Sequence, residues 1–346
     1  MRPWSNCLLV ALCLGAVINI PGKLLAGEVA AKEISTPDVV VDKGLIALIK
    51  LQAENGSFDS ATGITSLCGM AFLAGGHTPT RGIYREASRK ALEYVLKTQD
   101  KVSGYLGADQ GNMYSHGFAT LYLAECYGMS PDPTLRRSLE AAIDLIHRSQ
   151  NNEGGWRYQP SPVDADISVS ICQVMAMRGA FNVGIGGGAS QKAIAKAVTY
   201  VRRCSNGDGS FSYQAGGGGG WGTNGAEGIP RCAAGTMCLI GSGTTDLSDA
   251  VLGPAMRFLR THVYDHLQGR GDYYWYGQYY AAQALFHSPE IKDWENYWAK
   301  AWPTIARLQE SDGLWSRSDS VGPAFNTAMA LIILQIPNNY LPIFQR

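Results

Sequence analysis

Polar residues that could bind a ligand or move a proton stand near the starts of segments that are otherwise almost entirely apolar. Arg231 could hold a carboxylate or phosphate group, and His116 could exchange a proton with a nearby acid such as Asp166. The alternative is that these residues cap helices and hydrogen-bond to one another. The corresponding residues along the chain are Thr65, His116, Ser168, Arg231 and Asn326, with Tyr276 or Gln278 as the candidate in the remaining segment.

These positions correspond because the chain repeats itself. A glutamine is followed six residues later by an aromatic residue, with glycine between them. The copies lie about 50 residues apart, and a fixed period of this size is the signature of a repeat architecture. A degenerate copy that ends at Phe211 has lost the glutamine, and the aromatic residue of one further copy is expected within 273–276. The intact copies are Gln52 with Phe58, Gln99 with Tyr105, Gln150 with Trp156, and Gln309 with Trp315.

Each of the six repeats is predicted to contain two helices. The first is amphipathic, with apolar residues at the i, i+3, i+4 spacing of one helix face. The second is apolar almost all round, which is typical of a buried helix. The expected pairs are 38–53 with 62–75, 84–98 with 113–128, 134–150 with 164–182, 190–204 with 228–241, 248–264 with 273–287, and 294–309 with 322–335.

The repeats are expected to close into a ring. An open array needs atypical, polar end repeats, whereas the last predicted helix, which ends at Leu334, is as apolar as the middle ones. A ring of buried helices inside a ring of half-exposed helices covers every apolar face. The sequence therefore predicts an all-α fold, an α/α-toroid of about six helix pairs that spans 38–346 as a single domain.

The turn that ends each first helix has a structural explanation. Glutamine at a helix end can bond the free carbonyls of the last turn or the backbone of the next helix. Glycine permits the left-handed conformation that ends a helix, and the aromatic ring can cover the seam between neighbouring pairs. We therefore expect the turn residues to stabilise the fold rather than to react.

The composition excludes several classes of protein. The 346 residues are 46% hydrophobic and 17% charged, which is typical of a well-buried globular body. Lysine and arginine together number 29, as do aspartate and glutamate, so no basic field would attract nucleic acid. No CxxC pattern or other zinc spacing occurs. We therefore expect neither a metal nor a cofactor, and we interpret the cysteines after residue 26 as buried free thiols.

The N-terminus has the features of an export signal. Arg2 supplies a positive charge, and the apolar stretch 7–20 is too short for a comfortable membrane span. We expect 1–26 to be a signal peptide, with cleavage after Ala26 or alternatively after Ala31, and 27–37 to be a short linker. The exported protein would then be periplasmic or extracellular, with no integral membrane segment. The alternative is an uncleaved membrane anchor.

The repeats resemble the QW-type repeats of the terpenoid cyclase and protein prenyltransferase superfamily, whose members are α/α-toroids. Segments 113–117 and 154–158 are similar to exported bacterial proteins with prenyltransferase/squalene-oxidase-type repeats, which have no firmly assigned activity. The resemblance supports the toroid more strongly than it supports any one function.

The same resemblance implies a candidate acid. Class II terpene cyclases protonate their substrate with an Asp-x-Asp-Asp motif, and Asp164-Ala-Asp166 resembles it, with Ile167 in place of the last acid. Asp166 would be the proton donor, which requires surroundings that keep its carboxyl group protonated. The alternative is that Asp164 or Asp166 caps the helix that follows. The tyrosine-rich segment 273–280 could stabilise a carbocation, or it could serve ordinary packing.

The resemblance also implies where a catalytic zinc would lie. Protein prenyltransferases use an Asp-x-Cys pair and a later histidine. Cys232 stands at the matching cysteine, but Pro230 replaces the aspartate and Asn326 replaces the histidine. Since a zinc site needs at least three good ligands, a zinc-dependent prenyltransferase is disfavoured.

Three functions are compatible with these observations, and whether the protein is an enzyme stays open. The first is binding of an apolar or amphipathic ligand, such as a terpenoid or lipid, in the central cavity. The second is a squalene-cyclase-like isomerase that uses Asp166, with His116 as a second proton carrier. The third is a non-catalytic scaffold for another envelope protein. Ligand binding is favoured because it does not need the missing catalytic groups.

Overall fold

The computed structural model describes residues 36–107, 111–217, 223–316 and 321–345. The expected signal peptide 1–26 and nearly all of the linker 27–37 lie outside these residues, and residues 35–346 make up one compact unit. The described residues form twelve α-helices and no β-strand, so the predicted all-α fold of six helix pairs is confirmed.

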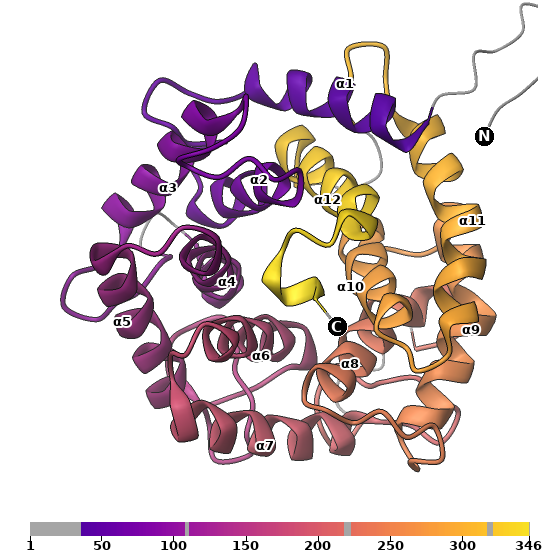
Figure 1. Cartoon of the computed structure of the whole chain (residues 1–346). Helices are drawn as coiled ribbons and strands as arrows, with labels where there is room; N and C mark the ends of the chain where they lie inside the picture. The colour runs from indigo at the N-terminus through magenta and orange to yellow at the C-terminus, as the bar shows by residue number, and fades with distance from the viewer. Residues whose placement is uncertain (1–35, 108–110, 218–222, 317–320, 346) are drawn as a thin grey trace, which may run out of the picture. The chain divides into compact units, whose positions relative to one another are not determined.

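Within this unit the helices alternate between an outer and an inner ring (Figure 1). The outer helices are α1 (Pro37–Ile49), α3 (Arg85–Thr98), α5 (Pro133–Ser149), α7 (Gly187–Cys204), α9 (Leu252–Leu267) and α11 (Ile291–Leu308). The inner helices are α2 (Thr62–Ala74), α4 (Met113–Met129), α6 (Ile167–Asn182), α8 (Ile229–Gly241), α10 (Tyr274–Phe286) and α12 (Pro323–Gln335). The predicted α/α-toroid is therefore the observed fold.

The two rings follow from the two hydrophobic patterns. In α3, Ala87, Ala91 and Val95 are buried at a spacing of four residues, while Glu86 and Glu93 are exposed. Such a helix buries one stripe and leaves the other face in water. In α12 nearly every residue is buried, because the outer helices cover its outward face and the other inner helices cover the rest.

The turn glutamines tie neighbouring outer helices together. The Gln52 side-chain amide donates to the Gly56 carbonyl in its own turn (3.1 Å) and to the Ala87 carbonyl of α3 (2.9 Å). Of the two expected partners, the backbone of the next helix is the one observed. The same pair of hydrogen bonds joins Gln99 to Gly104 and Ser138, Gln150 to Gly154 and Ala193, and Gln309 to Gly313 and Val40.

The turn glycines cannot be replaced without strain. Gly56 has a φ of 89°, which L-residues rarely adopt. A Cβ atom there would also overlap the carbonyl oxygen of Lys90, one helical turn beyond Ala87. Gly154 has a φ of 100° and faces Lys196 in the same way. The glutamine and the glycine of one turn therefore dock together on the next outer helix.

The turn aromatics lie in the seams between helix pairs. Phe58, Trp156, Phe211 and Trp315 are buried, and the Trp156 indole donates to the Ile146 carbonyl (2.8 Å). Tyr105 is part-buried and lies beside His116. The fifth repeat differs, because the tyrosine-rich segment starts α10 itself instead of forming the turn. One of its contacts with the preceding outer helix is made by the Tyr274 hydroxyl, which donates to the Leu267 carbonyl (3.2 Å).

The last repeat closes onto the first. Gln309 donates to the Val40 carbonyl of α1 (3.0 Å), and the Lys43 ammonium donates to the Glu310 carbonyl (3.0 Å). In the inner ring, the Gln335 amide of α12 donates to the Ala71 carbonyl of α2 (3.0 Å). Both rings are therefore closed by hydrogen bonds between the two ends of the unit.

The C-terminal segment crosses one end of the ring (Figure 1). Its 3₁₀ turn Pro342–Phe344 packs against α4 and α6, and Leu341 and Phe344 are buried. The Ile343 backbone N–H donates to Glu125 of α4 (3.2 Å). Burial raises the pKa of Glu125 to about 8. This end of the inner ring is therefore covered by the chain itself.

Three further observations concern the described residues only. Their six cysteines are buried and unpaired, as expected. No group of three potential metal-ligating side chains occurs among them. Among the helices in these residue ranges, none combines the length and the apolar character that crossing a membrane requires.

The ring closure generates a first prediction. Replacing Gln309 by alanine should lower the free energy of unfolding by about 1–3 kcal/mol, because the Val40 carbonyl loses its donor in a part-buried seam. Urea unfolding followed by circular dichroism measures the change. The control is Gln268→Ala, at the exposed end of α9, which should shift stability by less than about 0.5 kcal/mol. Equal effects of the two variants would contradict the closure argument.

Candidate functional site

A cavity of about 950 Å³ lies at the N-terminal ends of the inner helices. Every inner helix, or the turn leading into it, contributes to its wall. The aromatic side chains in the wall are Tyr114, Phe118, Tyr158, Tyr213, Tyr273, Tyr276 and Phe325, and the polar ones include Asn112, Ser115, Ser168, Glu227, Arg231 and Asp272.

The cavity changes character with depth along the inner helices. Asn112 and Asp272 precede the first turns of α4 and α10, whereas Leu67 and Phe118 belong to the second turns of α2 and α4. The polar groups in the wall therefore lie toward the opening, and the deepest groups in the wall are apolar. Such a gradient suits a ligand with one apolar and one polar end.

Below the cavity the centre of the ring is filled by aromatic side chains. Phe118 meets Tyr279 edge to face, with ring centroids 6.2 Å apart, and Tyr279 and Tyr280 are buried. The Tyr276 hydroxyl donates to the Ser168 carbonyl across the ring (3.0 Å). The toroid is thus hollow at one end and packed beneath.

Three of the residues singled out in the sequence line this cavity, namely Ser168, Arg231 and Tyr276. The Arg231 side chain also donates through Nε to the Phe211 carbonyl (3.1 Å). Burial lowers the pKa of this guanidinium group. Arg231 therefore lines the cavity and also stabilises the turn of the fourth repeat, which contains Phe211.

The expectation that Thr65 and His116 encircle the mouth needs correction. The Thr65 hydroxyl accepts from the Phe58 backbone N–H (2.9 Å). His116 Nδ1 accepts from the Leu106 N–H (3.1 Å), which leaves Nε2 to donate to the Ala142 carbonyl (3.1 Å). Burial lowers the pKa of His116 to about 4. Both of its nitrogens are used in a neutral ring, so His116 holds its repeat turn and does not reach Asp166.

Gln278 and Asn326 also lie away from the cavity wall. The Gln278 amide donates to His266 Nδ1 (2.8 Å) and its carbonyl accepts from the Tyr297 hydroxyl (2.9 Å). Asn326 is buried, and its side chain has no hydrogen-bond partner among the described residues. Successive helix residues point about 100° apart. In α12 the residue that lines the cavity is Phe325, one position before Asn326, so a prediction that is off by one residue misses the cavity wall.

Asp166 is the N-cap of α6, with a side chain that is 0% exposed. Its Oδ1 accepts from the Val169 N–H (2.8 Å), and its Oδ2 accepts from the Tyr213 hydroxyl (3.0 Å). Arg157 Nε lies 3.8 Å from Oδ2. Burial raises the pKa of Asp166 to about 6, although Val169, Tyr213 and Arg157 each act to lower it. The carboxyl group does not itself line the cavity.

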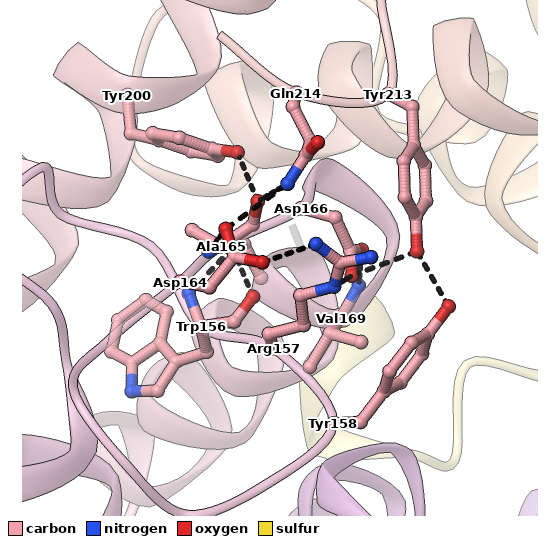
Figure 2. Close-up of polar contacts among 11 residues, drawn as sticks. Trp156, Arg157, Tyr158, Asp164, Ala165, Asp166, Val169, Tyr200, Tyr213 and Gln214 are labelled. Atoms are coloured by element: carbon pink, nitrogen blue, oxygen red, sulfur yellow. Dashed lines mark hydrogen bonds and ion pairs between the residues drawn. The ribbon is translucent and has the colours of Figure 1, made fainter. Parts of the chain in front are cut away.

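Arg157 organises the surroundings of Asp166, as Figure 2 shows. Its guanidinium group pairs with Asp164, whose other oxygen accepts from the Gln214 amide (3.0 Å). The same group lies 5.3 Å from the ring centre of Tyr158 and 5.6 Å from that of Tyr213. Two acids, one cation and two phenols from neighbouring repeats thus form one network.

Sequence reasoning missed Tyr158 and Tyr213 as site residues. Both line the cavity, and their hydroxyl oxygens lie 2.6 Å apart. A signal was present, because each tyrosine stands two residues after a turn aromatic, Trp156 and Phe211 respectively. The signal is weak, because the tyrosine recurs in only these two copies of the repeat.

Comparisons with known proteins identify the fold. No protein-family model and no curated protein matches the sequence. Cellobiose 2-epimerase from Spirochaeta thermophila DSM 6192 is 12% identical with a TM-score of 0.63, over 85% of this chain and 93% of that one.

Two further solved structures are similar to this chain. The GH76A α-1,6-mannanase from Salegentibacter sp. HEL1_6 is 8% identical with a TM-score of 0.65, over 88% of this chain and 100% of that one. The type II terpene cyclase MstE from Scytonema is 14% identical with a TM-score of 0.56, over 88% and 99%. At these identities the likeness shows the α/α-toroid and does not single out the terpenoid cyclases.

The buried carboxyl group generates a prediction about pH. With a pKa of about 6 in the folded protein, Asp166 holds its proton more tightly than in the unfolded chain, whose pKa is about 4. Its contribution to stability is therefore complete below pH 4 and is lost as the pH rises through 6. Between pH 4 and 7 the free energy of unfolding should fall by up to about 3 kcal/mol more in the wild type than in Asp166→Asn.

Urea unfolding of both proteins at several pH values measures this difference. Asp132→Asn, at the exposed N-cap of α5, is the matched control. Its free energy of unfolding should vary with pH as in the wild type, because Asp166 is intact. Parallel pH profiles for the wild type and Asp166→Asn would exclude a raised pKa at Asp166.

Proposed function

We propose that the toroid binds an amphipathic small molecule, terpenoid- or lipid-like, in the cavity at the N-terminal ends of its inner helices. The observation that carries this proposal is the cavity itself, about 950 Å³ in volume, with a polar opening and an apolar interior. Cavities of this size with mainly apolar walls and a few convergent polar groups are typical of small-molecule sites.

The two ends of the cavity would hold different parts of the ligand. Leu67 and Phe118 offer apolar surface in the deeper part, where burial of a hydrocarbon contributes about 25 cal/mol per Å². Asn112 and Ser168 offer hydrogen-bonding groups nearer the opening. An apolar body would therefore enter first and leave the polar end of the ligand among these groups.

A carbohydrate is the second candidate ligand, and a specific observation favours it. Two of the similar solved structures are named for action on sugars, a cellobiose epimerase and a mannanase. Tyrosine-rich walls offer both ring faces and hydroxyl groups, which suit a sugar as well. We also propose that residues 1–26 direct export, so that the ligand is met outside the cytoplasm; the apolar stretch 7–20 after Arg2 supports this.

Native mass spectrometry of the protein purified from a bacterial host tests the proposal. We expect a discrete bound mass that is released on denaturation and whose composition separates an isoprenoid or lipid from a sugar. Protein free of any adduct under several purification conditions, and no thermal shift with either ligand class, would favour the scaffold function instead.

A blocking variant makes the test specific to the cavity. Ala61 lines the cavity and has extended backbone angles that any residue adopts. Ala61→Trp should reduce the bound fraction at least about tenfold, since the indole occupies the opening. Ala53→Trp is the control. Residue 53 is exposed in the turn of the first repeat, so this variant should still bind the adduct. Retention of the adduct in Ala61→Trp would place the ligand elsewhere.

A further inference from the structure

A chain of hydroxyl groups leads from the cavity to the buried carboxyl group of Asp166 (Figure 2). The Tyr158 and Tyr213 hydroxyl oxygens are 2.6 Å apart, and Tyr213 Oη lies 3.0 Å from Asp166 Oδ2. Tyr158 is 39% exposed, Tyr213 is part-buried, and Asp166 is fully buried. The chain thus connects an accessible group in the cavity wall to an acid that no ligand could touch.

The direction of these hydrogen bonds follows from a count of donors. A phenol has one proton to donate. Tyr213 uses its proton on Asp166, so the short contact between the two phenols requires Tyr158 to donate to Tyr213. The lone pairs of Tyr158 are then available to accept a proton from the cavity side. When Asp166 is protonated, the chain can reverse and Tyr158 becomes a donor.

We propose that Tyr158, Tyr213 and Asp166 form a proton relay through which a ligand bound in the cavity loses a proton and regains it. Tyr158 is the catalytic residue that touches the ligand, and Asp166 is the store of the proton. The inference rests on the proposed function, because it needs a ligand in this cavity. It assigns the site acid–base chemistry of the kind that isomerisation requires.

The step balances without a co-reactant. The proton leaves an O–H or C–H bond of the ligand for Tyr158 Oη, and the electron pair of that bond stays on the ligand. The proton of Tyr158 moves to Tyr213, and the proton of Tyr213 moves to Asp166 Oδ2. The carboxylate becomes neutral as the ligand gains a negative charge, so the site as a whole keeps its charge. The reverse step returns a proton to the ligand, at the same or at a neighbouring atom.

The electrostatic surroundings suit a group that changes charge near neutral pH. With a pKa of about 6, Asp166 can be either protonated or ionised at a pH near neutral. Arg157 and Asp164 are the charged groups beside it. The other titratable groups that face it are phenols and thiols whose pKa values burial raises, so they stay neutral: Tyr114, Cys172, Tyr200, Cys204, Tyr213 and Tyr276.

Two alternatives are excluded by geometry. Asp166 cannot meet a ligand directly, since Oδ1 caps Val169, Oδ2 accepts from Tyr213, and the side chain is fully buried. His116 cannot replace it, because both of its ring nitrogens form hydrogen bonds with backbone groups, those of Leu106 and Ala142. A ligand in the cavity therefore reaches Asp166 only through the two phenols.

Acetylation of tyrosine by N-acetylimidazole tests the relay in the ligand-free protein. The acetyl carbon bonds to Tyr158 Oη and separates from the imidazole nitrogen, which takes a proton from water, while the proton of Tyr158 passes to Asp166. Ionised Asp166 should accelerate this reaction, so the rate at Tyr158 should rise through a midpoint near pH 6. Peptide mapping measures the rate at each tyrosine, and Tyr340, 49% exposed, is the internal control without such a midpoint.

Two variants separate the relay from a structural role. Tyr213→Phe leaves Asp166 in place but removes the middle oxygen, and Asp166→Asn removes the proton acceptor. Each should slow acetylation of Tyr158 about 10- to 100-fold and abolish the pH 6 midpoint, while Tyr340 is unaffected. If Asp166→Asn fails to fold, Tyr213→Phe still decides the question.

Tyr158 reacting with the pH dependence of Tyr340, or a Tyr213→Phe variant with wild-type reactivity at Tyr158, would overturn the relay. The outcome is independent of the native mass spectrometry, because no ligand is needed. If acetylation shows the relay but native mass spectrometry finds no bound molecule, the acid–base site stands and the proposed ligand class is rejected. If a bound molecule is found but acetylation shows no relay, the protein is a binding protein without this proton transfer.

Discussion

The connection between each outer helix and the next is the interaction on which the rest of the structure depends. Where glutamine is present, one side-chain amide bonds its own turn and the next outer helix, as Gln150 does with Gly154 and Ala193. The two repeats that lack the glutamine use an ion pair instead. Arg202 of α7 pairs with Asp249 before α9 (2.9 Å), and Arg260 of α9 pairs with Asp293 of α11 (2.7 Å). Each of these seams thus has a polar link, made either by a glutamine amide or by an ion pair.

Closure of the outer ring determines where function can arise. All inner helices point the same way, so their N-terminal ends meet at one end of the toroid, where N-cap and first-turn side chains surround a cavity. At the other end the C-terminal segment lies over the ring, held through Ile343 by the buried carboxyl group of Glu125. The cavity therefore lies at one end of the toroid, and the chain itself covers the opposite end.

The fold could be predicted from the sequence because its determinants are periodic. The glutamine–glycine–aromatic turn and the contrast between half-apolar and fully apolar helices repeat often enough to define helix pairs and ring closure. The site is not periodic. Ser168, Arg231 and Tyr276 line the cavity, whereas Thr65 bonds its own repeat turn and Asn326 is buried away from the cavity wall, because a shift of one residue rotates a side chain by about 100°. Nor could periodicity show that Tyr158 and Tyr213, from loops 55 residues apart, share a hydrogen bond.

Asp166 shows how one residue can be both structural and chemically active. A comparison with Asp132, the N-cap of outer helix α5, separates the two roles. Asp132 uses Oδ1 to accept from the N–H groups of Thr134 and Leu135, and its side chain is exposed to water. Asp166 caps α6 with Oδ1 in the same manner, yet burial in the inner ring opposes its ionisation and Oδ2 is left for Tyr213. The cap hydrogen bond favours the charged form and burial favours the neutral form, and burial outweighs the cap, so the pKa rises to about 6. Position in the inner ring, rather than residue type or a motif, therefore turns a helix cap into a group able to exchange a proton with the cavity.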